Sequence, residues 1–270
     1  MIEVRRVTYA YDKECRALED VNMDFDKGKI IGVIGVNGSG KSTLFQSIVG
    51  LLKPDKGEIL CEGMPIRYDK KSLYELRKKV GMVFQDPDKQ IFYDNVYEDI
   101  AFALRNMKLD ETEIKKRIEE ALERVGGIEW QKRGVHFLSH GQKKRVAIAS
   151  VLAMKQQLIL MDEPTAGLDP RSVRKMVQII KEIASDGTKV VISSHDMDLI
   201  YEICDYIYVL EKGKVISEGK IEEVFSKDNT LEEIGLSNPW LVKVHKYMGL
   251  PLFRTEKELY KYYEKQRSEA

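Results

Sequence analysis

The stretch Ile30–Ser42 reads IIGVIGVNGSGKS, and the fold of the chain can be argued outward from it. It opens with apolar residues and glycine only, which is typical of a strand buried on both faces of a parallel sheet. The rest matches the pattern G-x-x-x-x-G-K-[ST], in the required place between a strand and a predicted helix. Gly38 and Gly40 let the backbone curl so that its N–H groups converge on phosphate oxygens. Lys41 adds a positive charge toward the β- and γ-phosphates, and Ser42 offers a hydroxyl to Mg²⁺.

A second apolar strand, Leu158–Met161, leads into two adjacent carboxylates, Asp162 and Glu163. Ligands of open α/β sheets bind at this edge, beyond the carboxyl ends of the strands. Because adjacent side chains point in different directions, the two carboxylates can have different roles. We expect Asp162 to hold the shell of Mg²⁺ through water and Glu163 to polarise an attacking water. An isolated Asp-Glu pair after a strand is more often a solvated loop, and the phosphate-binding loop is what favours a functional interpretation.

Three further residues are candidates for the same site. Gln85 ends a short strand that begins at Gly81, and its neutral amide can contact Mg²⁺ or water. His195 follows the predicted strand Lys189–Ser194 and could hydrogen-bond the γ-phosphate or the water. Tyr11 could supply a flat face for adenine. The plainer alternatives are exposed surface residues for Gln85 and His195, and an ordinary packed or exposed side chain for Tyr11.

The stretch Leu138–Ala149, LSHGQKKRVAIA, predicts a helix that begins near Ser139 and Gly141. Backbone N–H groups at a helix start lack partners, and the helix dipole there favours an anion. The residues are therefore consistent with either an ordinary serine-capped helix or a helix that faces phosphate. From Val146 onward the small apolar residues are expected to pack. The residues expected to stay in solvent are Lys143, Lys144 and Arg145.

The alternation of strands and helices predicts an α/β fold with a parallel core. Residues 1–30 alternate in the manner of strands. A helical insertion is expected at about 88–155. Beyond about residue 225 the pattern changes to short helical pieces broken by prolines, so 226–270 is predicted to be a helical extension of the domain 1–225.

Composition excludes several classes of protein. The 270 residues carry 44 Lys and Arg against 44 Asp and Glu, so a nucleic-acid binder held by bulk positive charge has no support. No apolar run approaches the ~20 residues that a membrane span requires, and the N-terminus shows no signal-peptide pattern. The three cysteines are widely spaced, which favours free thiols in a reducing cytosol over disulfides or a metal site. We expect an intracellular globular protein.

Taken in order, these elements resemble the ATP-binding subunit of an ABC transporter, over about residues 1–225. LSHGQ (138–142) stands where that family has its LSGGQ signature, and Ala166–Asp169 is similar to the loop after its carboxylates. The one departure is His140, where the family usually has glycine. In the family the signature helix of one subunit binds the γ-phosphate held by the loop of the other. The resemblance thus implies that the helix beginning near Ser139 faces a partner's phosphate.

The resemblance also implies a P-loop NTPase (RecA-like) core with an antiparallel β subdomain, an inserted helical signature subdomain and a C-terminal helical extension. It implies ATP hydrolysis with Mg²⁺, in which Glu163 and the switch histidine His195 are catalytic. The Mg²⁺ ligands it implies are Ser42, Gln85 and Asp162. The ATP-binding residues it implies within one chain are Tyr11, Gly35, Val36, Asn37, Gly38, Ser39, Gly40, Lys41, Ser42, Thr43 and Gln85. Those it implies for the partner's ATP are Ser139, Gly141, Gln142 and Asp169.

Finer features resemble the energy-coupling-factor group of importers, and within it the ATPases of cobalt uptake. The similar stretches are QDPDKQIF (85–92), VYEDIAFAL (96–104), GQKKRVAIA (141–149) and the region near 231–270, which in that group helps to hold the ATPase dimer. The resemblance implies uptake of cobalt, nickel or a vitamin. It also implies a homodimer, or a heterodimer with a paralogous ATPase, bound to an integral transmembrane component and a substrate-binding membrane component. The chain would then lie peripherally on the cytoplasmic face of the cell membrane.

Two other classes of P-loop protein fit less well. A nucleic-acid-processing ATPase of the same superfamily would carry long coiled coils between Ser47 and Leu138, where no extended heptad run occurs. We therefore expect no nucleic-acid partner. A kinase for small metabolites has no use for the signature helix.

Overall fold

A six-stranded sheet forms the centre of the computed structural model, which describes residues 1–12, 15–226 and 230–269. In spatial order its strands are β10 (Lys214–Lys220), β9 (Tyr206–Glu211), β3 (Ile30–Ile34), β8 (Lys189–Ser194), β7 (Leu158–Asp162) and β6 (Val80–Val83). All neighbouring pairs are parallel except β9 with β10. The carboxyl ends of β3, β6, β7 and β8 therefore meet at one edge, as the sequence predicted.

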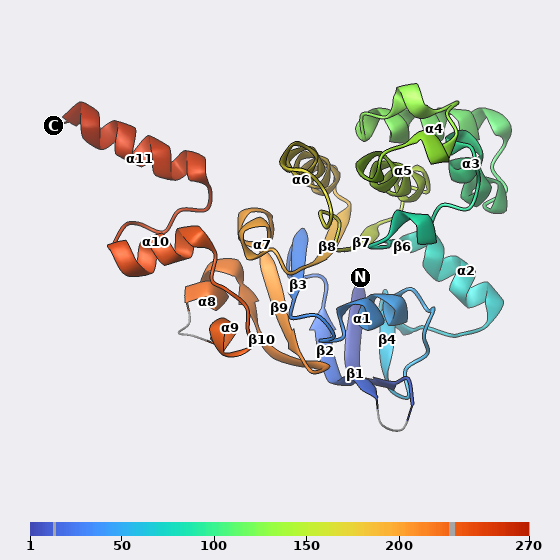
Figure 1. The fold of residues 1–270 in the computed structure, drawn as a ribbon. Helices are drawn as coiled ribbons and strands as arrows, with labels where there is room; N and C mark the ends of the chain where they lie inside the picture. The colour runs from blue at the N-terminus through green and yellow to red at the C-terminus, as the bar shows by residue number, and fades with distance from the viewer. Residues whose placement is uncertain (13–14, 227–229, 270) are drawn as a thin grey trace.

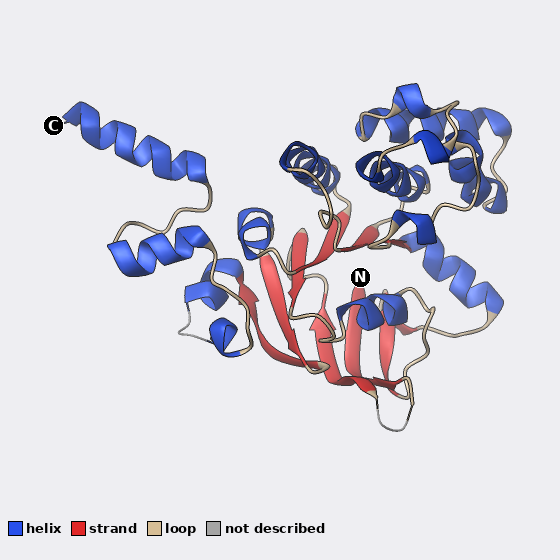
Figure 2. Cartoon of the chain, viewed as in Figure 1, coloured by secondary structure: helices blue, strands red, loops and turns tan. Residues whose placement is uncertain are grey.

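A second, antiparallel sheet packs beside the first (Figure 2). Its strands, in spatial order, are β2 (Arg16–Asp24), β1 (Ile2–Ala10), β4 (Lys56–Cys61) and β5 (Met64–Pro65). Helix α1 (Lys41–Ile48) joins the two sheets, because its Leu44 and Phe45 belong to one buried cluster with Val21 of β2 and Val33 of β3. The antiparallel subdomain thus holds the helix that the phosphate-binding loop opens.

Helices fill the chain between β6 and β7, as predicted. They are α3 (Val96–Asn106), α4 (Glu111–Arg124) and α5 (His140–Ala153), and α2 (Lys70–Lys79) precedes β6. Each of α3 and α4 packs against α5 through a fully buried apolar face, which includes Ile100 and Leu122. In Figure 1 this helical group lies at the upper right, away from the antiparallel sheet.

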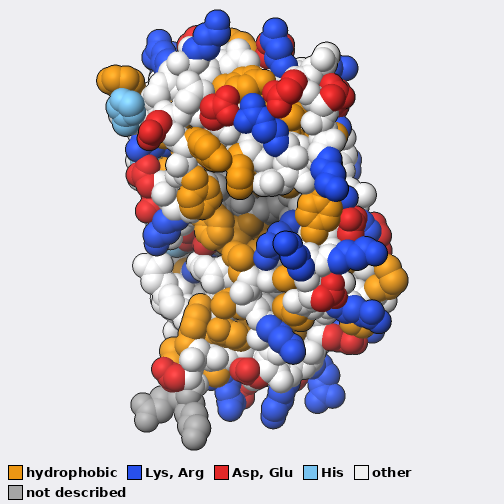
Figure 3. Space-filling model, turned by 90° about the vertical axis from the view of Figure 1, so that its right-hand side faces the viewer, with side chains coloured by type: hydrophobic (Ala, Val, Ile, Leu, Met, Phe, Trp, Pro, Cys, Tyr) orange, Lys and Arg blue, Asp and Glu red, His pale blue; other side chains and the backbone are white. Residues whose placement is uncertain are grey.

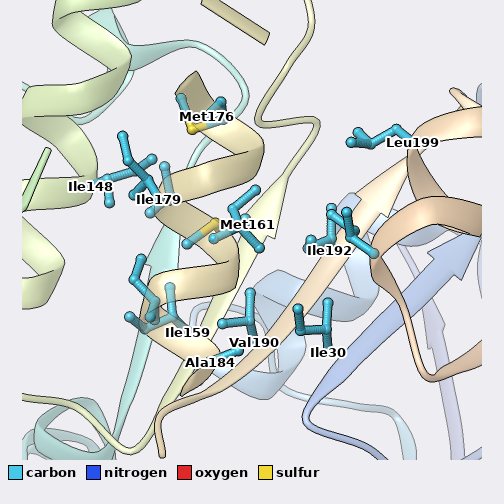
Figure 4. Packing of buried hydrophobic residues seen from close by; sticks show 14 of the residues in the cluster. Ile30, Ile148, Ile159, Met161, Met176, Ile179, Ala184, Val190, Ile192 and Leu199 are labelled. Atoms are coloured by element: carbon cyan, nitrogen blue, oxygen red, sulfur yellow. The ribbon is translucent and has the colours of Figure 1, made fainter. Parts of the chain in front are cut away.

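Helix α6 (Pro170–Ser185) covers the six-stranded sheet from the side opposite α1. Figure 4 shows Met176 and Ile179 of α6 above Ile159 and Met161 of β7, with Ile148 of α5 beside them. Helix α7 (Met197–Ile203) follows β8 and continues the same layer over β9. This packing fixes the start of α6 and the start of α5 on the same side of the sheet.

The C-terminal segment consists of α8 (Ile221–Ser226), α9 (Thr230–Glu233), α10 (Trp240–Met248) and α11 (Glu256–Glu269). It lies at the opposite end of the molecule from the helical insertion, and α11 projects away from the sheets (Figure 1). Arg254 anchors it, donating 2.7 Å to the carbonyl of Cys204 and 2.9 Å to Glu222. Within the described ranges, no helix has the length and apolarity needed to cross a bilayer.

Candidate nucleotide site

Most of the predicted site residues of one chain meet in a cleft of about 470 Å³ at the carboxyl edge of the six-stranded sheet. The predicted residues that do not line it are Gly35, Val36 and Ser39. Five separate regions of the sequence contribute: the segment after β1, the phosphate-binding loop, and the residues that follow each of β6, β7 and β8. The predicted residues among those lining the cleft are Tyr11, Asn37, Gly38, Gly40, Lys41, Ser42, Thr43, Gln85, Asp162, Glu163 and His195. Cys15, Arg16 and Ala17 also line it, and sequence analysis did not single them out.

The phosphate-binding loop is wrapped around its own lysine. Lys41 is buried, and its Nζ donates 2.7 Å to the carbonyl of Gly35 and 3.0 Å to that of Val36. Burial lowers the pKa of Lys41, and the negative charges of Glu163 and Asp162 raise it by a smaller amount. Among the described residues, no carboxylate forms an ion pair with Lys41, so the loop holds a cation that is suited to an anionic ligand.

Glycine is required at Gly40 by both conformation and space. Its φ is +105°, and a Cβ there would lie 2.5 Å from the carbonyl oxygen of Ala17. Gly40 is also the N-cap of α1, so no side chain caps the first N–H groups of that helix. Uncapped N–H groups at a helix start are suited to bind phosphate oxygens.

The two carboxylates at the end of β7 are held by β8. Asp162 Oδ1 accepts a 2.5 Å hydrogen bond from Ser193 Oγ, and the two residues face each other in the strand register. Glu163 leaves the strand in a left-handed conformation, with φ +47°, and its N–H donates to Ser193 Oγ at 3.0 Å. Its Oε2 lies 2.9 Å from His195 Nδ1. Glu163 is thus buried and aimed at His195, whose ring is mostly exposed in the cleft.

Oxygen donors for Mg²⁺ lie together in this cleft. They are the Ser42 hydroxyl, the Gln85 amide and the Asp162 carboxylate, and oxygen ligands with a single carboxylate are what Mg²⁺ prefers beside a phosphate. The residues present therefore fit the ion. Tyr11 also lines the cleft: its hydroxyl lies 3.1 Å from Thr43 Oγ1, and the residue is 55% exposed.

The residues predicted to act on a partner's nucleotide lie elsewhere. Ser139 is the N-cap of α5 and forms a capping box with Gln142. Asp169 is the N-cap of α6. The two helix starts pack together, since a Cβ at Gly141 would lie 3.3 Å from the Leu168 side chain. Within the described part of the chain, these four predicted residues do not line the cleft that contains Lys41.

One expectation for α5 is wrong. Lys144 is not in solvent: it is only 2% exposed, and its Nζ donates 3.0 Å to the carbonyl of Glu163 and 3.4 Å to that of Pro164. The physical reason is that these two carbonyls accept hydrogen bonds from the ammonium group and so replace water inside the protein. The sequence does contain a signal for this burial. Lys144 precedes the buried Ile148 and Val151 by four and seven residues, a spacing that places all three on the same face of the helix.

The neighbouring Arg145 is also partly buried. Its guanidinium lies 4.4 Å from the centre of the Trp130 ring and donates 3.0 Å to the carbonyl of Val125. Ser193 is a further site residue that sequence analysis missed, because its role depends on the register between β7 and β8.

Comparisons with known proteins agree with this geometry. Residues 18–166 match the family model described as ABC transporter. The chain is 47% identical to the cobalt import ATP-binding protein CbiO of Salmonella typhimurium, over 96% of each chain. It is 44% identical to the energy-coupling factor transporter ATP-binding protein EcfA of Methanocaldococcus jannaschii, over 88% of this chain and 86% of that protein.

Two solved structures are similar to the whole domain. One is CbiO1 of Clostridium perfringens, described as part of the ABC transporter complex CbiONQ, with TM-score 0.77, 41% identity and coverage of 91% of this chain and 98% of that one. The other is a dimeric ATP-binding cassette in a post-hydrolysis state with bound ADP and Pi. Its TM-score is 0.74, its identity 31%, and the match covers 82% of this chain and 99% of that one.

Proposed function

The chain belongs to the ABC transporter family, as an ATP-hydrolysing subunit of the energy-coupling-factor type, and from this premise we propose that it energises a membrane importer of cobalt ions. The observation that carries the proposal is the convergence of Lys41, Asp162, Glu163 and His195 in one cleft. That cleft lies in a chain that is similar along nearly its whole length to a cobalt import ATP-binding protein, and this similarity supports cobalt as the cargo.

In this proposal the phosphate-binding loop and Lys41 hold the β- and γ-phosphates, and the Tyr11 ring stacks on adenine. Ser42, Gln85 and Asp162 would hold Mg²⁺, which would neutralise charge on the phosphates. Glu163 accepts the proton of the attacking water, and His195 holds the Glu163 carboxylate in place. Glu163 is buried in the wall of the cleft, a position that suits a base whose carboxylate must contact the attacking water and be shielded from bulk solvent.

Each ATP would lie between the Lys41 of one chain and the Ser139 of a second. The capped starts of α5 and α6 present Ser139, Gly141, Gln142 and Asp169 outward, away from their own cleft, which supports a dimer with two composite sites. We propose that residues 1–225 form the nucleotide-binding domain, with its helical subdomain at about 88–155. We further propose that the extension 226–270 helps to hold a homodimer, or a heterodimer with a paralogous ATPase.

The membrane partners would bind on the side that carries α2 to α5. Hydrophobic side chains surround a hollow on this face (Figure 3). Phe92, Tyr93 and Phe102 are exposed in this part of the chain, and the rings of Tyr93 and Phe102 lie 5.6 Å apart. Exposed aromatic clusters of this kind mark protein–protein contacts. The chain would thereby sit peripherally on the cytoplasmic face, bound to a transmembrane component and a substrate-binding component.

Coexpression tests the proposal. The chain should enter the membrane fraction only together with an integral membrane component, and labelled cobalt should accumulate only when both are present and Glu163 is intact. Accumulation that is unchanged by Glu163→Gln would contradict the proposed role. A vitamin is the second candidate cargo, because the resemblance to the energy-coupling-factor importers implies one and the chain is also similar to EcfA, an ATP-binding protein of an energy-coupling factor transporter. Vitamin uptake without cobalt uptake, by the same complex, would select it.

A further inference from the structure

Lys144 of α5 is a buried cation that the mechanism above does not use. Burial lowers the pKa of Lys144, while the charges of Glu163 and Asp162 act in the opposite direction. No carboxylate within the described residues lies in ion-pair contact with it, and its two recorded partners are the carbonyls of Glu163 and Pro164. Placing an ammonium in the interior is unfavourable unless it is hydrogen-bonded. A neutral residue could fill the same space without that cost, so the charge calls for an explanation.

The segment that Lys144 holds is strained. Seven non-glycine residues in the described ranges have a positive φ, and Glu163 is the buried one among them. A left-handed conformation is unfavourable for a residue with a side chain and persists where the surroundings impose it. The backbone N–H of Glu163 donates to two oxygens of Ser193, the carbonyl at 3.2 Å and the hydroxyl at 3.0 Å. On the other side, the carbonyl of Glu163 accepts a hydrogen bond from Lys144. The peptide groups on both sides of the Glu163 Cα are therefore clamped.

This clamp sets where the carboxylate points. With its backbone held on both sides, Glu163 extends its side chain to His195 Nδ1 at 2.9 Å. Release of the carbonyl would let Glu163 relax toward an ordinary negative φ, which swings the Cα–Cβ bond away from its present direction. The carboxylate would then lose its aim without any change in the phosphate-binding loop.

We propose that Lys144 is a positioning residue, which holds Glu163 in its left-handed conformation and thereby sets the rate of hydrolysis of the ATP bound to its own chain. This inference rests on the proposed function of Glu163. Lys144 lies on α5, whose first residues face the other ATP of the proposed dimer. Helix α5 would therefore contact one composite site through Lys144 and the other through its N-terminal residues. The experiment must therefore show through which site Lys144 acts.

The first measurement compares homodimers. Lys144→Met keeps an unbranched apolar stem and removes the charge and the donors, and it should lower kcat about tenfold, equivalent to about 1.4 kcal/mol of activation free energy. KM and ATP affinity should stay within about twofold, because no contact to bound ATP is removed. The matched control is Lys143→Met, which removes the adjacent lysine and its 2.7 Å contact with Asp88 but nothing at Glu163.

Lys143→Met should keep kcat within about twofold of the wild-type value. A Lys144→Met protein with unchanged kcat, or with KM raised in proportion to the lost rate, overturns the proposal. Should Lys144→Met fail to fold, Lys144→Leu, which also removes the charge and the donors, takes its place, and the same split between kcat and KM is required of it.

Mixed dimers then identify the site. A partner with Lys41→Ala leaves only the site that uses the Glu163 of the first chain, whereas a partner with Ser139→Arg leaves only the site that uses the α5 of the first chain. Lys144→Met in the first chain should slow the former dimer about tenfold and the latter less than about twofold. The reverse pattern would show that Lys144 acts through the helix start, and would overturn the proposal.

The wild-type first chain with each of these partners is the reference. If both reference dimers are inactive, hydrolysis requires two intact sites, and the assignment of Lys144 is then decided by the homodimers. A Glu163→Gln homodimer that hydrolyses ATP at the wild-type rate would instead remove the proposed function on which the inference rests.

Discussion

Among single residues, Glu163 combines the features expected of the base. It is buried, its carboxylate meets His195, and its backbone is held in a left-handed conformation by groups from β8 and α5. Strained backbone that the surroundings impose is found mainly at functional sites, where it orients a reactive group in advance. Asp162, its neighbour, has an ordinary strand conformation and a short bond to Ser193. In the proposed mechanism, these different backbone conformations would let the two adjacent carboxylates serve different purposes.

Glu163→Gln should bind ATP and hydrolyse it slowly, because the amide keeps the shape and loses the base. We expect a decrease of about 10²–10⁴-fold in the rate constant of a single-turnover measurement, with nucleotide affinity preserved. Glu211→Gln is the control. Glu211 ends β9, the strand next to β3, but does not line the cleft, so its variant should keep the wild-type rate. A Glu163→Gln rate within about twofold of wild type would rule out the assigned role.

At the scale of elements, the N-cap of α5 has two roles that substitution can separate. Ser139 satisfies the backbone N–H of Gln142, and in the proposed dimer its hydroxyl also meets a partner's γ-phosphate. Asn and Asp are both N-caps as good as Ser, but only Asp carries a negative charge. The capping role depends on the oxygen, whereas the phosphate role depends on the charge.

Ser139→Asn and Ser139→Asp should therefore keep the free energy of unfolding within about 0.5 kcal/mol of wild type, as denaturant titration can show. Only Ser139→Asp should abolish the ATP-bound dimer, measured by size-exclusion chromatography with Glu163→Gln present to stop turnover, because a carboxylate would face the γ-phosphate. Equal dimerisation of the two variants would mean that Ser139 is a cap and nothing more.

A residue of helix α3 holds the turn that carries the exposed aromatic residues Phe92 and Tyr93. Asp99 is buried, and its Oδ1 accepts from the backbone N–H of Phe92 at 2.8 Å and of Tyr93 at 3.2 Å. Burial raises the pKa of Asp99, and the hydrogen bonds from Phe92 and Tyr93 oppose that rise. The carboxylate thus fixes the turn that presents the two rings.

Asp99→Ala should weaken assembly with the membrane component while the isolated subunit keeps its ATPase activity within about twofold. Copurification with the membrane component measures the first, and a phosphate-release assay the second. The cost in the free energy of unfolding should be about 1–3 kcal/mol, since the two N–H groups lose their acceptor. The exposed Asp94→Ala is the matched control and should assemble normally. Normal assembly of Asp99→Ala would argue against this surface as the contact.

For the whole molecule, the arrangement of two half-sites on one chain makes the sharpest prediction. Lys41→Ala and Ser139→Arg should each be inactive as homodimers, because both composite sites lose one half. In a mixed dimer one site loses both halves, while the other joins an intact loop to an intact signature helix. Coexpressing the two inactive chains should therefore restore measurable ATPase activity.

The control for this experiment is the coexpression of two chains that both carry Lys41→Ala, which should stay inactive. If purified dimers of Lys41→Ala with Ser139→Arg are no more active than either parent, Ser139 does not serve the partner's nucleotide. A requirement that both sites fire together is tested by adding Glu163→Gln to both chains: one trapped ATP per mixed dimer supports the composite site, and none refutes it.

The sequence by itself determined the elements and the chemistry of the loop. The buried strands Ile30–Ile34 and Leu158–Asp162 were predicted to within about two residues, and a helix was predicted after Gly40, because local hydrophobic patterns and glycine conformations act over short stretches. Parallel strands also bring their carboxyl ends to one edge, so the meeting of Gln85, Glu163 and His195 followed from their positions after strands.

Only the tertiary structure decided what those residues touch. The strand order places β8 beside β7, and that neighbourhood alone gives Ser193 its hold on Asp162 and Glu163. The left-handed conformation of Glu163 and the burial of Lys144 likewise depend on α5 packing against a turn distant in sequence. The physical reason is that periodicity reveals which face of an element is hidden, whereas the partner on that face is selected by packing among all the elements at once. From the sequence alone, Lys144 is expected to lie in solvent. The fold buries it because two carbonyl groups replace water as its hydrogen-bond acceptors.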